Sequence, residues 1–375
     1  MFRFKLLSLM SMCAVSLVAT LTAQGQTPTF VQTNLVTNNP AAHAGQITDA
    51  NLVDPWGVSF SPTGPIWVSN SRTGTSTLYR IDPATDATVK QGLTVTIPGA
   101  GSPTGQNFNS NTASGAFNGD NFLFVSLDGT ISGWRGALGT AAETFQTAST
   151  ANTYTGSAFA TISGHSYLYA ANFKNGTIDV LKGDVAAPNL TGSFTDPNLP
   201  TGYTPFNTQV LNGKLYVAYV LRSGAFTGSG GGVIDVFDFN GNFLSRVGSQ
   251  GTLVSPWGLT IAPSSFGSYA GDLLVGNFGN GKINAFDLTS NSFVGQLSNQ
   301  DGSLVSIDGL WALTTGNNGG SGSGNALYFS SGPDRGSNGI LGSLRAVPEP
   351  GQLAYLLGIG ATGLGIAMRS RRRKA

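Results

Sequence analysis

Asp54-Pro55-Trp56-Gly57-Val58-Ser59-Phe60 returns later in the chain as Ser255-Pro256-Trp257-Gly258-Leu259-Thr260-Ile261. A third, altered copy is Asp308-Gly309-Leu310-Trp311-Ala312-Leu313. Weaker copies begin at Thr104, Thr155 and Phe206, so the six copies follow one another at steps of about 50 residues. Such a regular step indicates one structural unit repeated six times.

Each copy reads as four short strands separated by turns. Its first strand opens at the repeated motif, and a second apolar strand follows; the second strands are predicted at 66–70, 122–127, 167–172, 214–220, 273–277 and 327–330. Asn-Gly and Asp-Gly pairs between the apolar runs are strong hairpin signals. Third strands are predicted at 175–180, 232–237 and 280–286, and outer strands at 93–97, 144–147, 190–194, 243–247 and 293–297.

Four antiparallel strands repeated six times predict an all-β fold, a six-bladed β-propeller. The sixth copy supplies three strands, and the segment Thr29–Val36 is a well-formed strand without a blade of its own. We expect this N-terminal strand to complete the last blade and close the ring. Two stacked β-sandwiches would not explain the constant step.

The composition agrees with a turn-rich β protein and excludes several functions. The 375 residues include 53 glycines, and Cys13, the single cysteine, lies in the N-terminal apolar run. Seven of the 19 basic residues lie at the two ends, which leaves 12 Lys and Arg against 17 Asp and Glu in the body. Such an acidic body argues against a nucleic-acid partner.

The two ends are predicted to be targeting segments outside the fold. Residues 1–25, with Arg3 and Lys5 before an apolar run, read as a signal peptide for export through the Sec pathway. Residues 27–346 form the propeller. Residues 347–375 combine the triplet Pro348-Glu349-Pro350, an apolar stretch long enough to be a transmembrane helix, and a basic tail.

This three-part tail resembles the PEP-CTERM sorting signal of Gram-negative bacteria that secrete extracellular polysaccharide. The resemblance implies that exosortase, a membrane transpeptidase, is a processing partner that removes the tail. It further implies a transient inner-membrane anchor through the C-terminal helix, followed by release to the cell surface or the extracellular space. An ordinary C-terminal membrane anchor is the alternative.

Repeated aromatic and polar residues mark the candidate binding site. In a propeller the innermost strands surround a channel, so residues at equivalent strand ends meet at one mouth. Aromatic rings there can stack on a sugar, and a ring of carboxylate and amide oxygens suits a hard cation such as Ca²⁺. The candidates are Asp54, Trp56, Asn70, Asn172, Trp257, Asn277, Asp308 and Trp311.

Each candidate also has a structural interpretation. The tryptophans would then pack between neighbouring blades, and the Asn and Asp side chains would bond to their own turns. Catalytic constellations are scarce: His43 and His165 are the only histidines, and no Gly-x-Ser-x-Gly elbow occurs. The sequence therefore assigns no catalytic residue, and an enzyme is the less favoured class.

The Pro-Trp-Gly openings and the turn Asn277-Phe278-Gly279-Asn280-Gly281 resemble an uncharacterised bacterial family of secreted, often PEP-CTERM-tagged propellers. More distantly the blades resemble NHL-type and gluconolactonase-like six-bladed propellers. The latter hold a divalent metal through one Glu, two Asn and one Asp; Glu143, the one Glu of the body, lies in a predicted outer strand and does not match.

Two functions follow as hypotheses. The first is an exported binding or scaffold protein for extracellular polysaccharide or for a surface protein. The alternative is a propeller hydrolase or lactonase that uses a divalent cation in the channel.

Overall fold

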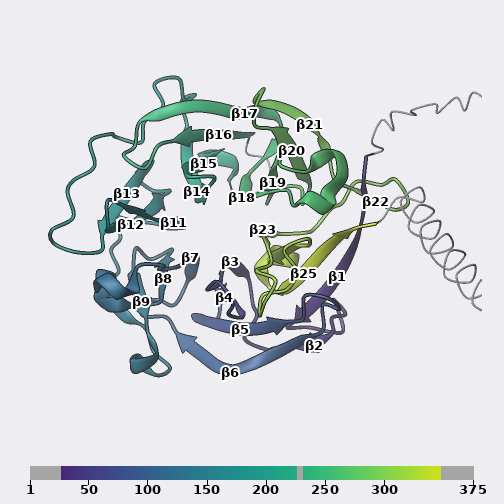
Figure 1. The fold of residues 1–375 in the computed structure, drawn as a ribbon, viewed down its shortest axis with the longest axis horizontal. Coiled ribbons are helices and arrows are strands. Elements are labelled where there is room, and N and C mark those ends of the chain that lie inside the picture. Colours follow the sequence, from purple (N-terminus) through teal and green to yellow (C-terminus); the bar gives the residue numbers. More distant parts are fainter. Residues whose placement is uncertain (1–26, 226–230, 348–375) are drawn as a thin grey trace, which may run out of the picture.

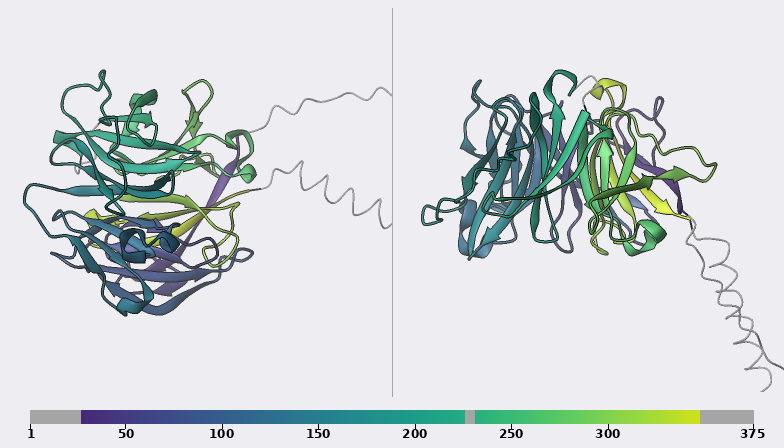
Figure 2. Two further views of the ribbon diagram at one scale, coloured as in Figure 1. Left: turned by 60° about the vertical axis from the view of Figure 1, so that its left-hand side comes forward. Right: turned by 90° about the horizontal axis from the view of Figure 1, so that it is seen from above.

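The computed structural model describes residues 27–225 and 231–347, and these residues form a ring of six β-sheets (Figure 1). The sheets stand around a central axis, and from the side the ring is a short, flat cylinder (Figure 2). The predicted six-bladed propeller is confirmed. The predicted signal peptide and almost all of the predicted sorting signal lie outside the described residues.

The first three blades follow the chain from its innermost strand outward. Blade one contains β3 (Pro55–Ser59), β4 (Ile66–Asn70), β5 (Thr75–Ile81) and β6 (Thr88–Thr96). Blade two contains β7 (Pro103–Phe108), β8 (Phe122–Ser126), β9 (Ile131–Trp134) and β10 (Glu143–Gln146). Blade three contains β11 (Tyr154–Ile162), β12 (His165–Asn172) and β13 (Thr177–Lys182).

The remaining blades continue in the same way. Blade four contains β14 (Tyr203–Leu211), β15 (Lys214–Leu221), β16 (Gly231–Phe237) and β17 (Phe243–Val254). Blade five contains β18 (Pro256–Ile261), β19 (Leu273–Asn277), β20 (Ile283–Asp287) and β21 (Ser292–Gln296). Blade six contains β23 (Leu310–Thr315), β24 (Leu327–Ser331), β25 (Ile340–Ala346) and β1 (Thr29–Thr37).

The N-terminal strand closes the ring, as the sequence predicts. β1 pairs antiparallel with β25, with Phe30 opposite Ala346 and Thr37 opposite Ile340. Two short strands, β2 (Ile47–Thr48) and β22 (Ser298–Asn299), pair parallel with β1. The last blade is therefore built from both ends of the body.

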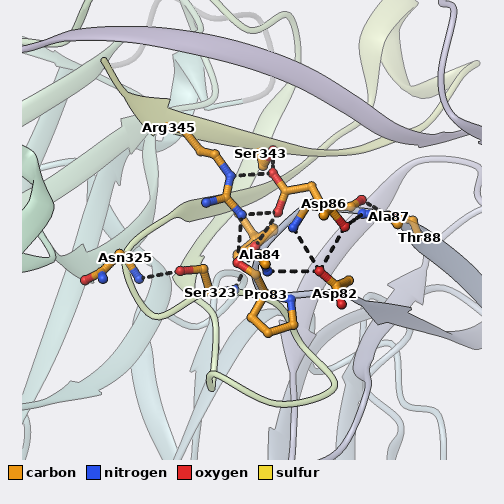
Figure 3. A network of polar contacts seen from close by, with 12 residues as sticks. Asp82, Pro83, Ala84, Asp86, Ala87, Thr88, Ser323, Asn325, Ser343 and Arg345 are labelled. Atoms are coloured by element: carbon orange, nitrogen blue, oxygen red, sulfur yellow. Dashed lines mark hydrogen bonds and ion pairs between the residues drawn. The ribbon is translucent and has the colours of Figure 1, made fainter. Parts of the chain in front are cut away.

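An ion pair with a buried carboxylate reinforces this closure (Figure 3). Asp86, in the turn between β5 and β6 of blade one, accepts hydrogen bonds from Arg345 on β25, at 2.7 Å from Nε and 2.5 Å from Nη2. Tyr328 and Ser343 donate to the same carboxylate at 2.8 and 2.9 Å. The first and last blades are thus joined by a fully bonded carboxylate.

Small residues repeat in the innermost strands because neighbouring blades approach closely there. A Cβ added at Gly57 would lie 2.9 Å from the backbone nitrogen of Gln106 and still closer to the carbonyl oxygen of Thr104. A Cβ at Gly258 would meet the backbone of Trp311 in the same way. The Trp-Gly pair of the motif is therefore a requirement of the ring itself.

Blade three departs from the prediction. Residues 190–194, predicted to be its outer strand, are not a strand, and β13 is the outermost strand of this blade. The backbone of these residues bonds to the turn between β16 and β17 instead: Gly192 donates to the carbonyl of Asn240 at 2.8 Å. Pairing with the next blade has replaced pairing within the blade.

In residues 27–225 and 231–347, helical structure is confined to short turns. The structure contains η1 (Thr112–Ser114), η2 (Ala116–Gly119), η3 (Gly136–Leu138), η4 (Arg222–Gly224), η5 (Ser264–Tyr269) and α1 (Pro333–Gly336). Within the described part of the chain, no helix has the length and apolar character needed to cross a bilayer.

Candidate functional site

A cavity of about 670 Å³ opens at the end of the ring where the innermost strands begin. The residues around it come from blades five, six and one, and from the turns between their second and third strands. They are Asp54, Trp56, Arg72, Phe278, Gly279, Asp308, Gly309, Trp311, Gly332, Arg335 and Gly336. We call this space the mouth cavity; it brings together the predicted residues Asp54, Trp56, Asp308 and Trp311.

The floor of the mouth cavity is a stack of aromatic rings. Trp311 stacks on Trp56, with ring centroids 3.5 Å apart, and on Phe278, with centroids 4.1 Å apart. Trp257 meets the Trp311 ring edge-on at 5.9 Å but does not line the cavity. All three tryptophans are buried, and they pack blades one, five and six against one another. Of the three, Trp56 and Trp311 also line the cavity.

Asp54 lies at the junction of the floor and the wall. Its side chain accepts a hydrogen bond from the Trp311 indole Nε1 at 3.2 Å, and the Arg72 Nε lies 4.0 Å from its other oxygen. Burial raises the pKa of Asp54, while hydrogen bonds from the Trp56 and Trp311 indoles and the charge of Arg72 oppose the increase. A partly desolvated carboxylate of this kind is a typical feature of a binding site.

Two glycines leave room for this carboxylate. A Cβ at Gly336 would lie 2.8 Å from the Asp54 Cγ, and one at Gly332 would touch its Oδ1. Asp54 itself has a φ of 50°, in the left-handed region. The local backbone is therefore shaped around the Asp54 side chain.

The rim next to Asp54 is a strained turn. Within α1, Asp334 and Arg335 have φ values of 56° and 59°, where non-glycine residues are uncommon. Asp308 accepts from the Asp334 amide at 2.9 Å, and the His43 Nε2 lies 2.9 Å from the Asp334 carboxylate. Strained backbone held by several contacts is common at functional sites.

Charges of both signs surround the mouth cavity. Asp54 and Asp308 supply two carboxylates, and Arg72 and Arg335 supply two guanidinium groups. Arg72 is tied to the rim because its Nη2 donates to the carbonyl oxygen of Arg335 at 2.9 Å. A ligand here meets donors and acceptors in similar number above an aromatic floor.

Apart from four glycines, sequence reasoning missed three residues of the cavity: Arg72, Phe278 and Arg335. Each lies in a turn between a second and a third strand, shortly after the strand end that the sequence identified in its own blade. Those turns reach the mouth together with the starts of the innermost strands. The three residues occupy similar positions in their repeats, just after the second strand, and this shared position could have identified them.

The three predicted asparagines bond to neighbouring strands and do not line the cavity. Asn70 donates to Thr77 at 2.9 Å, and Asn172 donates to Asp179 at 2.7 Å. Asn277 donates to the Thr252 carbonyl at 2.8 Å. Asn70 and Asn172 thus bond to the third strand of their own blade, and Asn277 bonds to β17 of blade four.

The channel below the floor is almost filled. The space among the innermost strands is about 30 Å³, against about 670 Å³ in the mouth cavity. Two of its polar side chains already have partners: Gln106 accepts from Ser76 at 2.7 Å, and Asn207 donates to the Trp257 carbonyl at 2.8 Å. Ligand space at this end of the axis is therefore in the mouth cavity.

Only part of the predicted ring of carboxylate and amide oxygens lines the mouth cavity, because the three asparagines lie outside it. Among the described residues, no group of three or more His, Cys, Asp and Glu side chains is placed to hold a metal ion. The mouth cavity offers two carboxylates, Asp54 and Asp308. A Ca²⁺ site stays a prediction.

The sequence comparisons place the chain in a family with viral members. It is 30% identical over 337 residues to the uncharacterised protein R648 of Acanthamoeba polyphaga mimivirus, and the match covers 83% of this chain and 78% of R648. A second mimivirus protein, L690, is 33% identical over 186 residues, which are 47% of this chain and 48% of L690. The chain belongs to the family of R648, whereas the sequence resemblance pointed to a bacterial family.

No protein-family model matches the chain. Among solved structures it is similar to a glucose dehydrogenase, with a TM-score of 0.52, 12% identity, and coverage of 85% of this chain and 99% of that one. It is also similar to a periplasmic gluconolactonase of Pseudomonas aeruginosa, with a TM-score of 0.44, 16% identity, and coverage of 79% and 89%. At these identities the similarity concerns the propeller fold alone.

Proposed function

We propose that the protein is a binding protein that holds a saccharide unit of an extracellular polysaccharide in the mouth cavity. The supporting observation is the combination of an aromatic floor with two carboxylates and two guanidinium groups. Sugar hydroxyls both donate and accept hydrogen bonds, so they match a wall of mixed charge. The exposed part of an aromatic floor suits the apolar face of a sugar ring.

Calorimetric titration with a panel of neutral and acidic oligosaccharides tests this function. Arg72→Ala should weaken binding of the saccharide that binds best by about tenfold or more, because a hydrogen bond to a charged group is lost. Arg72 is 55% exposed, so the variant should keep its fold.

Arg80→Ala is the matched control. Arg80 is an exposed arginine of the same blade that does not line the mouth cavity. Equal affinities of parent and Arg72→Ala for that saccharide would contradict the proposed site, and so would a panel in which no saccharide binds.

The alternative function, a hydrolase or lactonase that uses a divalent cation, has less support. The three asparagines bond to neighbouring strands and do not line the cavity, so the cavity retains two carboxylates of the expected oxygen ring.

Export completes the proposal. It rests on the signal-like residues 1–25 and on the tail with Pro348-Glu349-Pro350. The mass of the protein recovered from culture supernatant and from membranes tests it: loss of the first 23 to 25 residues supports Sec export, and loss of the tail supports processing by exosortase. An intact chain in the cytosolic fraction would contradict both.

A further inference from the structure

The outer edge of blade three is open. Every other blade has a strand outside its third strand: β6, β10, β17, β21 and β1. Among the described residues, β13 pairs with β12 alone. An unpaired strand edge carries a row of backbone donors and acceptors that can accept another strand.

The register shows which backbone groups face outward. Gly183 donates to the carbonyl of Ser166 at 2.8 Å, which extends the antiparallel ladder of β12 and β13 by one pair. Bonded and non-bonded pairs alternate in such a ladder, so the N–H and C=O groups of Ile178, Val180 and Lys182 point away from β12. The β12–β13 register has no bulge, and β13 contains no proline that would discourage pairing.

The segment of this chain that should cover the edge is held elsewhere. Residues 190–194 bond to the turn of blade four, with Gly192 donating to Asn240 at 2.8 Å and Phe194 donating to Gly241 at 3.0 Å. These bonds use the backbone donors that a fourth strand would need. The open edge is therefore a fixed feature of the ring.

Two grooves adjoin β13. One, of about 270 Å³, is of mixed character: Ile178, Val180 and Phe194 line it together with polar residues such as Asn189 and Ser193. The other, of about 420 Å³, is mainly apolar and is lined by Leu181 and Phe117, among others. Successive side chains of a paired strand point to opposite faces, so an added strand can place polar and apolar side chains in the first groove and apolar side chains in the second.

Blade six provides the precedent for an added strand. Its outer position is filled by β1, which comes from the opposite end of the chain and pairs antiparallel with β25. A blade of this propeller thus accepts an outer strand that is not continuous with it. Blade three presents the corresponding position without a strand in it.

We propose that β13 binds an extended, proline-free segment of a partner protein as the fourth strand of blade three. Backbone hydrogen bonds to Ile178, Val180 and Lys182 fix its direction, apolar side chains fill the groove beside Leu181, and a mixture of polar and apolar side chains fills the other groove. This interaction surface is separate from the mouth cavity and does not depend on the function proposed for that cavity.

Hydrogen exchange measured by NMR on the full chain tests the proposal. The probe is a synthetic peptide with the sequence of β1, Thr29–Thr37, which is proline-free and already serves as an outer strand. Saturating peptide should slow exchange of the Ile178, Val180 and Lys182 amides by about tenfold or more. A scrambled peptide, and one N-methylated at alternate residues, should give no protection.

Two variants of one residue separate backbone from side-chain effects. Val180→Pro removes an outward N–H without removing a bond to β12, and it should abolish the protection at Ile178 and Lys182. Val180→Ala keeps that N–H, so the peptide should still protect the Ile178 and Lys182 amides in this variant.

Three results would overturn the proposal. The first is no protection by the β1 peptide. The second is full protection of the three amides in the chain alone at every concentration, which would assign the edge to residues 190–194. The third is protection that rises with protein concentration alone, which would assign the edge to a second copy.

Discussion

At the scale of single residues, the glycines of the innermost strands set the width of the ring. Gly57, Gly105, Gly156 and Gly258 occupy equivalent positions, and at each a Cβ would collide with the innermost strand of the next blade. In the Trp-Gly pair of the sequence motif, the tryptophan therefore joins the aromatic cluster at the mouth, and the glycine allows the backbones of two neighbouring blades to touch.

Gly57→Ala should lower the free energy of unfolding by about 1–3 kcal/mol, because the neighbouring backbone cannot move aside without strain. Gly92→Ala is the control, since a Cβ at Gly92, on β6, meets nothing within 4 Å. Denaturant unfolding of both variants checks the prediction. A Gly57→Ala variant as stable as Gly92→Ala would show that the blades are less tightly packed than described.

Two buried carboxylates give the stability a predictable pH dependence. Burial raises the pKa of Asp120 and of Asp235 to about 6 each, although Arg135 and Arg246 oppose the increase. An Asp in the unfolded chain titrates near 3.9, so the folded state binds protons more tightly between these values. The free energy of unfolding should therefore rise as the pH falls from about 7 to about 5.

Asp120→Asn should flatten this rise, because it removes one of the two carboxyl groups whose pKa is raised to about 6. Asp82→Asn should leave it unchanged, because Asp82 is exposed and its pKa is lowered by hydrogen bonds from its own turn. Thermal unfolding midpoints from pH 5 to 8 check both. A parent midpoint that falls as the pH drops from 7 to 5 would contradict the assignment.

At the scale of elements, the closure of the ring depends on β1 and on the Asp86–Arg345 pair. The Asp86 side chain is 6% exposed and that of Arg345 is 36% exposed. Arg345→Met leaves Asp86 without its charged partner, at a cost near the lower end of about 3–5 kcal/mol, because Arg345 is partly in water.

Asp86→Asn combined with Arg345→Met should recover part of this loss, because no charge is then buried unpaired. Denaturant unfolding of the single and double variants gives the coupling energy directly. Additive losses would show that the pair does not act as a unit.

Slower hydrogen exchange in β1 than in β10 is expected in the parent and should be lost in Arg345→Met.

The elements also show why prediction succeeded in some places and failed in others. The alternation of apolar strands and Gly-bearing turns is local information, and it predicted the six blades and the role of the segment Thr29–Val36. Residues 190–194 have the same local pattern, yet they bond to Asn240 and Gly241 of the next blade. That choice depends on tertiary contacts that no local pattern contains.

The candidate site was predicted in part for the same reason. Asp54, Trp56, Asp308 and Trp311 open the innermost strands, and the ring geometry brings strand starts together. The direction of a side chain is a finer property: Asn70 and Asn277 lie at the correct end of their strands but bond to partners nearby. Arg335 reaches the mouth cavity from a turn whose left-handed backbone the sequence does not indicate.

At the scale of the whole molecule, the ends of the body lie side by side. The Val347 amide donates to the Thr29 carbonyl at 2.8 Å. Chains whose ends lie together often tolerate circular permutation when the new ends fall in an exposed loop.

A permutant of residues 27–347 with a short Gly/Ser linker between its old ends should fold, with new ends between Val185 and Ala186. Val185 is fully exposed and lies in the connection from β13 to β14. Near-UV circular dichroism, which reports the packed tryptophans, should match that of the parent body. New ends between Val68 and Ser69, within buried β4, should abolish folding.

The pairing of β1 with β25 has a consequence for biogenesis. Of the described strands a ribosome makes β1 first and β25 last, so β1 lacks its long antiparallel partner until translation of the body is complete. Pairings between distant segments form slowly and leave strand edges exposed meanwhile. Nascent chains halted before β25 should therefore carry an accessible β1 that proteases cut readily, and full-length chains should become resistant in a single late step.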